Sequence, residues 1–319
     1  MVTSTKLLRL PDRGRLLVAA DLHGNLRDYL AIVAHFENLG SDGYLLFLGD
    51  LLHGPYVPFE SWGGHPCLRG RPYRDQSPAL LLSVTELMSR YPGRVFVLLG
   101  NHEHAHIGGP RTSLFARDEA AILEQRIGIE NSSWLTELLS SLPLWAVTSS
   151  GLLFSHAAPG ALLSSLGDLD QLDYRLYSPP SIRADSIGSG AGDQPDAAAL
   201  LGRLLWGSSL SPALASQVLG ALGLTLSIYG HSIIPAGYQT IGSQQLILSS
   251  SFGMEDAYKK ILCLDLAMKY GAASALRLGH EILPLYPIPS APAAVELGRK
   301  APRFQATRPA RTTILRPTP

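Results

Sequence analysis

The chain has 319 residues, and because 46% of them are apolar it can bury a sizeable core. Its 26 basic and 26 acidic side chains balance, which excludes a strong net field that would draw it to nucleic acid or to an anionic membrane. Two cysteines, Cys67 and Cys263, are too few for a disulfide framework, and the N-terminal segment has no apolar signal core. We therefore expect a cytoplasmic protein without a nucleic-acid or membrane partner.

The first elements predict a βαβ unit. Residues 15–20 are almost entirely apolar, as in a strand covered on both faces, and residues 27–39 carry an apolar face at helical spacing. Residues 44–48 form the next apolar run. We expect two neighbouring parallel strands connected by a helix.

A long irregular segment, residues 54–78, follows the second strand and is rich in proline and glycine. Loops longer than about 15 residues are usually functional or disordered, and this one begins beside Asp50, so we interpret it as a wall or lid of an active site. A helix at residues 78–90 and a third strand at residues 94–99 come next.

The middle of the chain departs from the parallel order. Helices are expected between residues 113 and 141, and residues 144–148 and 151–155 predict an antiparallel hairpin around Ser149 and Ser150. Residues 178–196, rich in proline, serine, glycine and aspartate, predict a mobile excursion.

An uncharged run from residue 204 to residue 230 raises the question of a membrane span. Glycine, serine and proline interrupt it, so we interpret it as a helix at residues 212–222 and a strand at residues 226–229. Three further strands, expected as a meander, are predicted at residues 238–241, 245–249 and 260–266.

These elements predict an α/β (α+β) fold in which two mixed β-sheets pack face to face as a sandwich flanked by helices. Residues 1–286 would form one domain, and residues 287–319, with many prolines and no periodicity, a disordered tail.

Five of the predicted strands stop at an aspartate, asparagine or histidine. In open α/β sheets, sites lie outside the carboxyl ends of the strands, so we expect these polar side chains to meet. The set comprises Asp21, His23, Asp50, Asn101, His156 and His231. Its mixed nitrogen and oxygen ligands suit manganese, iron or zinc. Six ligands exceed one four-coordinate site, which favours two divalent ions sharing Asp50 as a bridge.

The motifs that carry these residues resemble those of the calcineurin-like metallophosphoesterases, most closely the phosphoprotein phosphatase family of serine/threonine phosphatases. The resemblance covers about residues 16–266, and its motifs are Asp21-Leu-His-Gly-Asn25, Gly49-Asp50, Gly100-Asn-His-Glu103, the isolated His156, Leu205-Trp206 and Gly230-His231.

The resemblance assigns roles to these residues. It implies that Asp21 and His23 bind the first metal, that Asp50 bridges, and that Asn101, His156 and His231 bind the second metal. It also implies that a hydroxide between the metals attacks phosphorus in line, and that His102 protonates the leaving group. A structural hydrogen-bonding role is the alternative for His102.

The chain departs from the family pattern at the residues that bind phosphate. Residues 51–55 replace an Asp-Arg-Gly segment that supplies an orienting acid and a phosphate-binding arginine, and no charged residue occurs between Gly207 and Tyr229. As substitutes for the missing cations we propose Arg69, Arg71, Arg74 and Arg111. His53 could stand in for the missing acid or be simply solvated. His104 and His106 could touch substrate, but a surface turn is favoured for both.

The predicted function is hydrolysis of phosphomonoesters by a dinuclear metal centre, with a phosphorylated protein or a small phosphoester as substrate. Phosphoserine and phosphothreonine are favoured. One alternative is a diadenosine tetraphosphatase-like hydrolase, because residues 49–55 faintly resemble its motif. Another is a binding module that keeps the metals without turnover, which the missing arginines motivate. The sequence does not define the oligomeric state.

Overall fold

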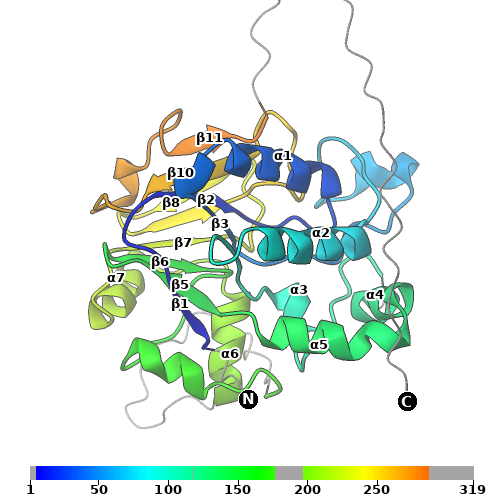
Figure 1. Ribbon diagram of the computed structural model, residues 1–319, viewed down its shortest axis with the longest axis horizontal. Helices are drawn as coiled ribbons and strands as arrows, with labels where there is room; N and C mark the ends of the chain where they lie inside the picture. Colours follow the sequence, from blue (N-terminus) through cyan, green and yellow to red (C-terminus); the bar gives the residue numbers. More distant parts are fainter. Residues whose placement is uncertain (1–4, 117, 177–196, 287–319) are drawn as a thin grey trace, which may run out of the picture. The chain divides into compact units, whose positions relative to one another are not determined.

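The predicted strands assemble into two sheets in the computed structural model of the protein, which describes residues 5–116, 118–176 and 197–286 (Figure 1). The first sheet has the spatial order β11 (Ile282–Pro284), β10 (Lys260–Asp265), β2 (Arg15–Ala19), β3 (Gly43–Phe47) and β4 (Val95–Val97). The second has the order β1 (Leu7–Arg9), β5 (Trp145–Val147), β6 (Leu152–Ser155), β7 (Leu226–Tyr229), β9 (Gln245–Leu248) and β8 (Tyr238–Ile241). Both sheets are mixed, and the predicted sandwich is confirmed.

Each sheet contains a run of three parallel strands. In the first sheet β2 pairs parallel with β3, and β3 with β4. In the second sheet β6 pairs parallel with β7, and β7 with β9. Parallel strands bring their carboxyl ends to one edge of the sheet, and in five of these six strands that end leads to a predicted ligand.

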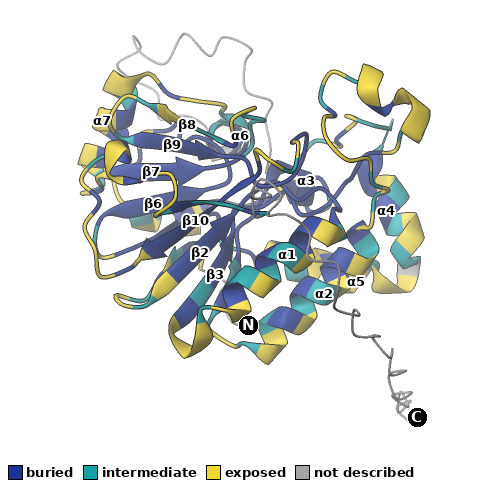
Figure 2. Ribbon diagram, turned by 90° about the horizontal axis from the view of Figure 1, so that it is seen from above, coloured by how far each residue is buried: buried dark blue, intermediate teal, exposed yellow. Residues whose placement is uncertain are grey.

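The strands are buried on both faces, which explains their continuous apolar sequences. On β2, Leu16 and Val18 pack between the sheets, whereas Leu17 and Ala19 belong to the core under the helices. Phe154 and other apolar side chains of the second sheet complete the layer between the sheets. Figure 2 shows the buried strands at the centre and exposed residues on the outer helix faces.

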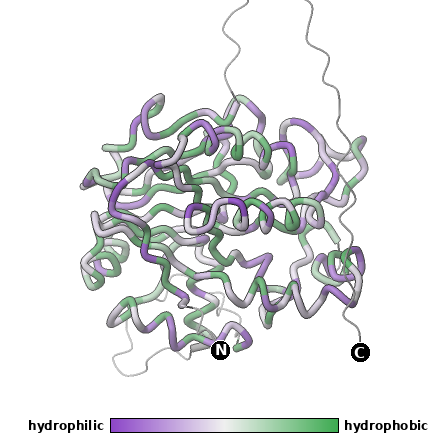
Figure 3. The backbone as a smooth tube through the Cα atoms, in the orientation of Figure 1, coloured by the Kyte–Doolittle hydropathy of each residue, from purple (hydrophilic) through white to green (hydrophobic). Residues whose placement is uncertain are grey.

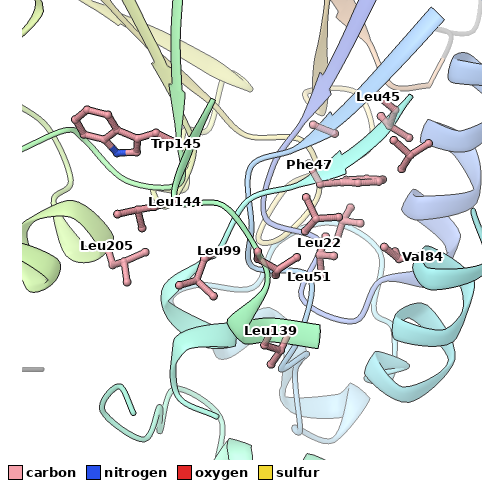
Figure 4. Close-up of a cluster of buried hydrophobic side chains, with 14 of the residues drawn as sticks. Leu22, Leu45, Phe47, Leu51, Val84, Leu99, Leu139, Leu144, Trp145 and Leu205 are labelled. Carbon is pink, nitrogen blue, oxygen red and sulfur yellow. The ribbon is translucent and has the colours of Figure 1, made fainter. Parts of the chain in front are cut away.

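Helices cover the outer faces. The helices are α1 (Leu26–Glu37), α2 (Ser77–Arg90), α3 (Asn101–His104), α4 (Glu119–Ile127), α5 (Ser132–Ser140), α6 (Ala197–Trp206) and α7 (Pro212–Ala221). Along α2 the tube in Figure 3 changes between hydrophilic and hydrophobic, and Leu80 and Val84 of its apolar face enter the core. Figure 4 shows Phe47 and Val84 in this core, with Leu205 of α6 near Trp145.

Most predicted elements of the first 230 residues agree with the structure to within a few residues, including the hairpin of β5 and β6. The predicted meander is wrong in part. Strands β8 and β9 do pair antiparallel, but β10 crosses to the other sheet and pairs with β2. Short edge strands β1 and β11, helix α3 and helix α6 were not predicted.

The predicted excursion at residues 178–196 and the predicted tail at residues 287–319 lie outside the described residues. The described residues between 5 and 286 belong to one compact unit, and the predicted extent of the domain stays a prediction. The predicted loop, residues 54–78, contains one short 3-10 helix, Phe59–Gly64. Within the described ranges, no helix is both long and apolar enough to cross a bilayer.

Candidate metal centre

The six predicted ligands follow the carboxyl ends of five strands. Asp21 and His23 follow β2, and Asp50 follows β3. Asn101, which opens α3, follows β4, while His156 and His231 follow β6 and β7. All are buried except His231, which is half-buried. The structure therefore brings together side chains from both sheets.

Four of these residues direct their ligand atoms at a common point. His156 Nε2 lies 2.8 Å from Asn101 Oδ1, 3.1 Å from His231 Nδ1 and 3.4 Å from Asp50 Oδ2. His231 Nδ1 lies 3.0 Å from Asn101 Oδ1. With metal–ligand bonds of about 2.0–2.2 Å, neighbouring ligands in one coordination shell lie about 3.0–3.4 Å apart. The spacing fits a single ion.

Hydrogen bonds on the far side of the rings fix which nitrogen carries a lone pair. His156 Nδ1 lies 3.0 Å from the carbonyl oxygen of Leu48, which can only accept, so this nitrogen is the donor. In the neutral ring, His156 Nε2 then presents its lone pair to Asn101 Oδ1, which is itself an acceptor. Such orientation of ligating histidines by backbone carbonyls is a common feature of metal sites.

The same arrangement occurs on the other side of Asp50. His23 Nδ1 donates to the carbonyl oxygen of His53 at 3.1 Å, which leaves His23 Nε2 facing Asp50 Oδ2 at 3.5 Å. Ligand atoms of His23, Asp50 and His102 all lie within 4.8 Å of one another. Asp21 belongs to neither group of close ligand atoms; its carboxylate accepts the backbone N–H of His231 at 3.1 Å. Asp50 is common to the two groups, as a bridging ligand would be.

The electrostatics of the cluster favour a cation. Burial and the charge of Asp50 raise the pKa of Asp21, and burial raises the pKa of Asp50. Burial lowers the pKa of His156 to about 3 and that of His231 to about 4, so both rings are neutral near pH 7. The neutral imidazoles present free lone pairs, and a divalent ion beside the two buried carboxylates would stabilise their ionised form, in which carboxylates bind metal.

A buried carboxylate whose role was not predicted supports the bridging residue. Glu103 Oε2 accepts the backbone N–H groups of Asp50 at 2.7 Å and Gly100 at 3.0 Å, and Oε1 accepts those of Leu51 and Leu52 at 2.8 and 3.1 Å. Burial, followed by the charge of Asp50, raises the pKa of Glu103 to about 8. Its only signal in the sequence is its place in the Asn-His-Glu motif.

His102 lies beside the centre in a row of imidazoles. Its backbone N–H donates to Asp50 Oδ1 at 3.0 Å, and its ring meets that of His23 edge-on at 4.6 Å between centroids. His102 Nδ1 lies 3.1 Å from Nδ1 of His53, which is buried rather than solvated. His53 Nε2 in turn lies 2.9 Å from His106 Nε2.

The surface turn favoured for His104 and His106 is wrong. The His104 ring is buried and bonds the carbonyl oxygen of Tyr174 at 2.6 Å. The side chain of His106 is 1% exposed, and its Nδ1 lies 2.8 Å from Glu124 Oε1. Short helix α3 and the turn that follows it direct both rings inward, and a four-residue helix inside a loop gives no periodic signal.

The four arginines of the proposed phosphate clamp are all exposed. Arg69, Arg71 and Arg74 are exposed, and Arg111 forms ion pairs with Glu124 at 3.0 Å and Asp118 at 3.8 Å. These positions do not test a role in phosphate binding.

The loop that bears three of these arginines does reach the centre. Tyr73 OH donates to the carbonyl oxygen of His23 at 3.1 Å. Trp62 of the loop packs in one cluster with Phe252, whose ring lies 4.3 Å from that of His23 between centroids.

Comparisons with known proteins agree with this geometry. A protein-family model described as calcineurin-like phosphoesterase matches residues 14–235. The chain is 29% identical over 193 residues to serine/threonine-protein phosphatase PP2A-like PPG1 of Candida albicans, an alignment that covers 58% of this chain and 40% of that protein. The chain thus spans about two fifths of the length of this curated relative.

Solved structures share the fold at low identity. A protein serine/threonine phosphatase from Saccharomyces cerevisiae, with similarity to human phosphatase PP5, superposes with a TM-score of 0.53 at 17% identity, over 82% of this chain and 76% of that chain. A cold-active protein-tyrosine phosphatase of Shewanella also gives 0.53, at 16% identity over 84% and 80%.

Proposed function

Because the chain belongs to the calcineurin-like phosphoesterase family, we propose that it hydrolyses phosphomonoesters at a centre of two divalent metal ions. The observation that carries this proposal is the convergence of lone pairs from both sheets: His156 Nε2 and Asn101 Oδ1 lie 2.8 Å apart, and both are acceptors. An ion resolves that contact, since two acceptors at this distance otherwise repel.

We assign the ligands as the motifs imply. Asp21 and His23 would hold one ion, and Asn101, His156 and His231 the other, with Asp50 shared. Two such ions supply an activated water near pH 7 and neutralise the charge that builds up on a phosphoryl group. The mixed nitrogen and oxygen set suits manganese, iron or zinc.

We assign His102 as the general acid. Its backbone N–H is fixed on Asp50, and its ring lies edge-on to His23, so it borders the proposed metals without being needed to hold them. From that place it would deliver a proton to the leaving oxygen. His53, which occupies the position of the family's orienting acid, lies against His102 Nδ1 and restricts the ring.

As substrate class we propose phosphoserine and phosphothreonine in proteins. Similarity to a PP2A-like serine/threonine phosphatase supports this choice. The position of the arginine-bearing loop beside Phe252 and His23 gives such a substrate a wall with exposed cations.

The test is a hydrolysis assay of the full chain with Mn²⁺ and three substrates: an aryl phosphate, a phosphoserine peptide and a dinucleotide polyphosphate. We expect turnover of the first two, loss of bound metal and activity in Asp50→Asn, and a kcat about 10²–10⁴-fold lower in His102→Asn. Asp12→Asn, at an exposed position, is the matched control. Turnover of the dinucleotide alone would favour a diadenosine tetraphosphatase-like enzyme. Bound metal without any turnover would favour a binding module.

A further inference from the structure

A second cluster of ligand atoms lies on the far side of His102. His53 in the turn after β3, His102 on α3 and Glu119 at the start of α4 bring one ligand atom each within 4.8 Å of the others. All three residues are buried, with exposed fractions of 3%, 6% and 5%. His102 Nδ1 lies 3.1 Å from His53 Nδ1 and 3.7 Å from Glu119 Oε2.

Hydrogen bonds along the imidazole row determine where the His53 lone pair points. Glu124 Oε1, 2.8 Å from His106 Nδ1, can only accept, so His106 carries its proton there. In the neutral ring, His106 Nε2 then accepts from His53 Nε2 at 2.9 Å. His53 is left with an unprotonated Nδ1, which faces His102. A carboxylate that orients a histidine in this way is typical of the surroundings of metal ligands.

Glu119 gives an independent indication of a missing partner. Its Oε1 accepts the backbone N–H of Phe115, whereas Oε2 is buried and has no hydrogen-bond partner among the described residues. A buried carboxylate oxygen without a partner is costly, and such groups are normally paired or bound to metal. Oε2 lies 3.7 Å from His102 Nδ1, and Glu119 belongs to one group of close ligand atoms with His53 and His102.

We propose that His53 Nδ1, His102 Nδ1 and Glu119 Oε2 bind a third divalent cation of the zinc class, beside the proposed pair. Two imidazoles and one carboxylate form a ligand set that zinc takes in sites with an open fourth position. In the metal-free chain the Thr112 hydroxyl, 3.0 Å away, donates to His53 Nδ1, and the ion would replace that donor.

The ion would take the place of the orienting acid that this chain lacks. Bound at Nδ1, it fixes His102 in the tautomer that keeps its proton on Nε2, the nitrogen available to a leaving group. This consequence rests on the proposed function, whereas the site rests on its own geometry.

The test is a metal count on the full chain, freed of metal by chelation, incubated with excess Zn²⁺ and desalted. Elemental analysis should give about three ions per chain in the wild type and about two in both Glu119→Gln and His53→Gln, because one ligand of a three-ligand site is lost in each. Glu119→Gln keeps the acceptor for Phe115, so it guards against a folding defect in the other variant. Glu137→Gln, at an exposed position on α5, should keep three.

The outcomes separate this inference from the proposed function. Two ions in the wild type, or three in both site variants, would overturn the third site, and a direct hydrogen bond between His102 and His53 would then explain the contact. Three ions together with failure to hydrolyse any phosphoester would leave the third site standing and remove the proposed function.

Discussion

At the scale of single residues, the centre is built on strained backbone. The non-glycine residues with positive φ in the described ranges are Asp21 at 54°, His23 at 43°, Asp50 at 51°, His53 at 62° and His231 at 65°. Side chains other than glycine rarely adopt this left-handed region, and each instance costs of order 1 kcal/mol or more. All five lie at the candidate centre. The unfavourable backbone conformation therefore occurs where the chain turns sharply at the end of a strand and directs a side chain into the centre.

Single arginines of the loop provide the first prediction at this scale. Replacing Arg69, Arg71 or Arg74 by Ala should raise KM for a phosphopeptide several-fold and leave kcat nearly unchanged, if an exposed guanidinium binds substrate and transition state equally. Steady-state kinetics at saturating metal would measure this. Arg126 pairs with Asp75 and serves as a structural arginine for comparison, so Arg126→Ala should lower the melting temperature instead.

The fourth candidate should behave differently. Arg111 is paired with Glu124, which orients His106, so Arg111→Ala should change kcat more than KM. If none of the four alanine variants changes either constant, the arginines have no part in substrate binding.

The candidate ligands were recognisable from sequence because they follow apolar strands, and all but Asp21 stand directly beside a glycine or another polar residue. Glu119 and Glu124 were not predictable, because an acid near the start of a helix or on its exposed face looks like an ordinary cap or surface residue. Only the packing of α4 against the turn after β3 shows that they face His53 and His106.

At the scale of elements, hydrogen bonds from backbone N–H groups to the Glu103 carboxylate connect helix α3 to the turn after β3. In the metal-free chain its pKa is raised from the usual 4.5 to about 8, so the folded state retains a proton that the unfolded state releases. The free energy of unfolding should therefore decrease as pH rises from about 4.5 through about 8. Histidines with a lowered pKa act in the opposite direction only below about pH 6.5.

The decisive comparison is urea unfolding of the chelated protein at pH 6.5 and pH 8.5. The wild type should be less stable at pH 8.5, and the loss should be smaller in Glu103→Gln, which does not titrate. At pH 6.5 this variant should itself be about 1–3 kcal/mol less stable, because buried N–H groups lose an acceptor. A loss equal to that of the wild type would show that Glu103 is not the titrating group; exposed Glu137→Gln is the control.

Elements whose apolar residues recur over a long pattern were predicted well, and short elements without such a pattern were missed. Strand β2 and helix α1 have long apolar patterns, whereas β1 and β11 have three residues each and depend on pairing with β5 and β10. The partner of β10 could not be inferred from the sequence. Consecutive strands usually pair with each other, which favours β9, but in the folded protein β10 pairs with β2 in the other sheet.

At the scale of the whole molecule, the candidate centre connects two sheets. Asp21, His23, Asp50 and Asn101 extend from the first sheet, and His156 and His231 from the second. Between the sheets lies an apolar layer that includes Leu46, Phe154 and Ile228, and it needs no metal to be buried. Bound ions would thus add stability at one edge of a sandwich that already has its core.

Chelation should lower the melting temperature without unfolding the protein at 25 °C. An ion present at about 100 times its Kd contributes about 2.7 kcal/mol, which for a domain of this size is a shift of about 5 °C. Metal-loaded and chelated samples of the wild type, Asp50→Asn and Asp12→Asn should be compared by differential scanning calorimetry. The shift should persist in Asp12→Asn and shrink in Asp50→Asn, because only Asp50 is shared between the two groups of ligands.

Hydrogen exchange of the same samples locates the effect. In the chelated protein, exchange should become faster at residues 21–25, 49–53 and 229–232, turns that belong to different sheets. The central amides of β2 and β7 should stay protected, because their inter-strand hydrogen bonds are covered by the apolar layer between the sheets. Faster exchange in the turns of one sheet alone would mean that the ions are held by that sheet and do not join the two. Uniformly faster exchange would mean that the sandwich itself depends on metal.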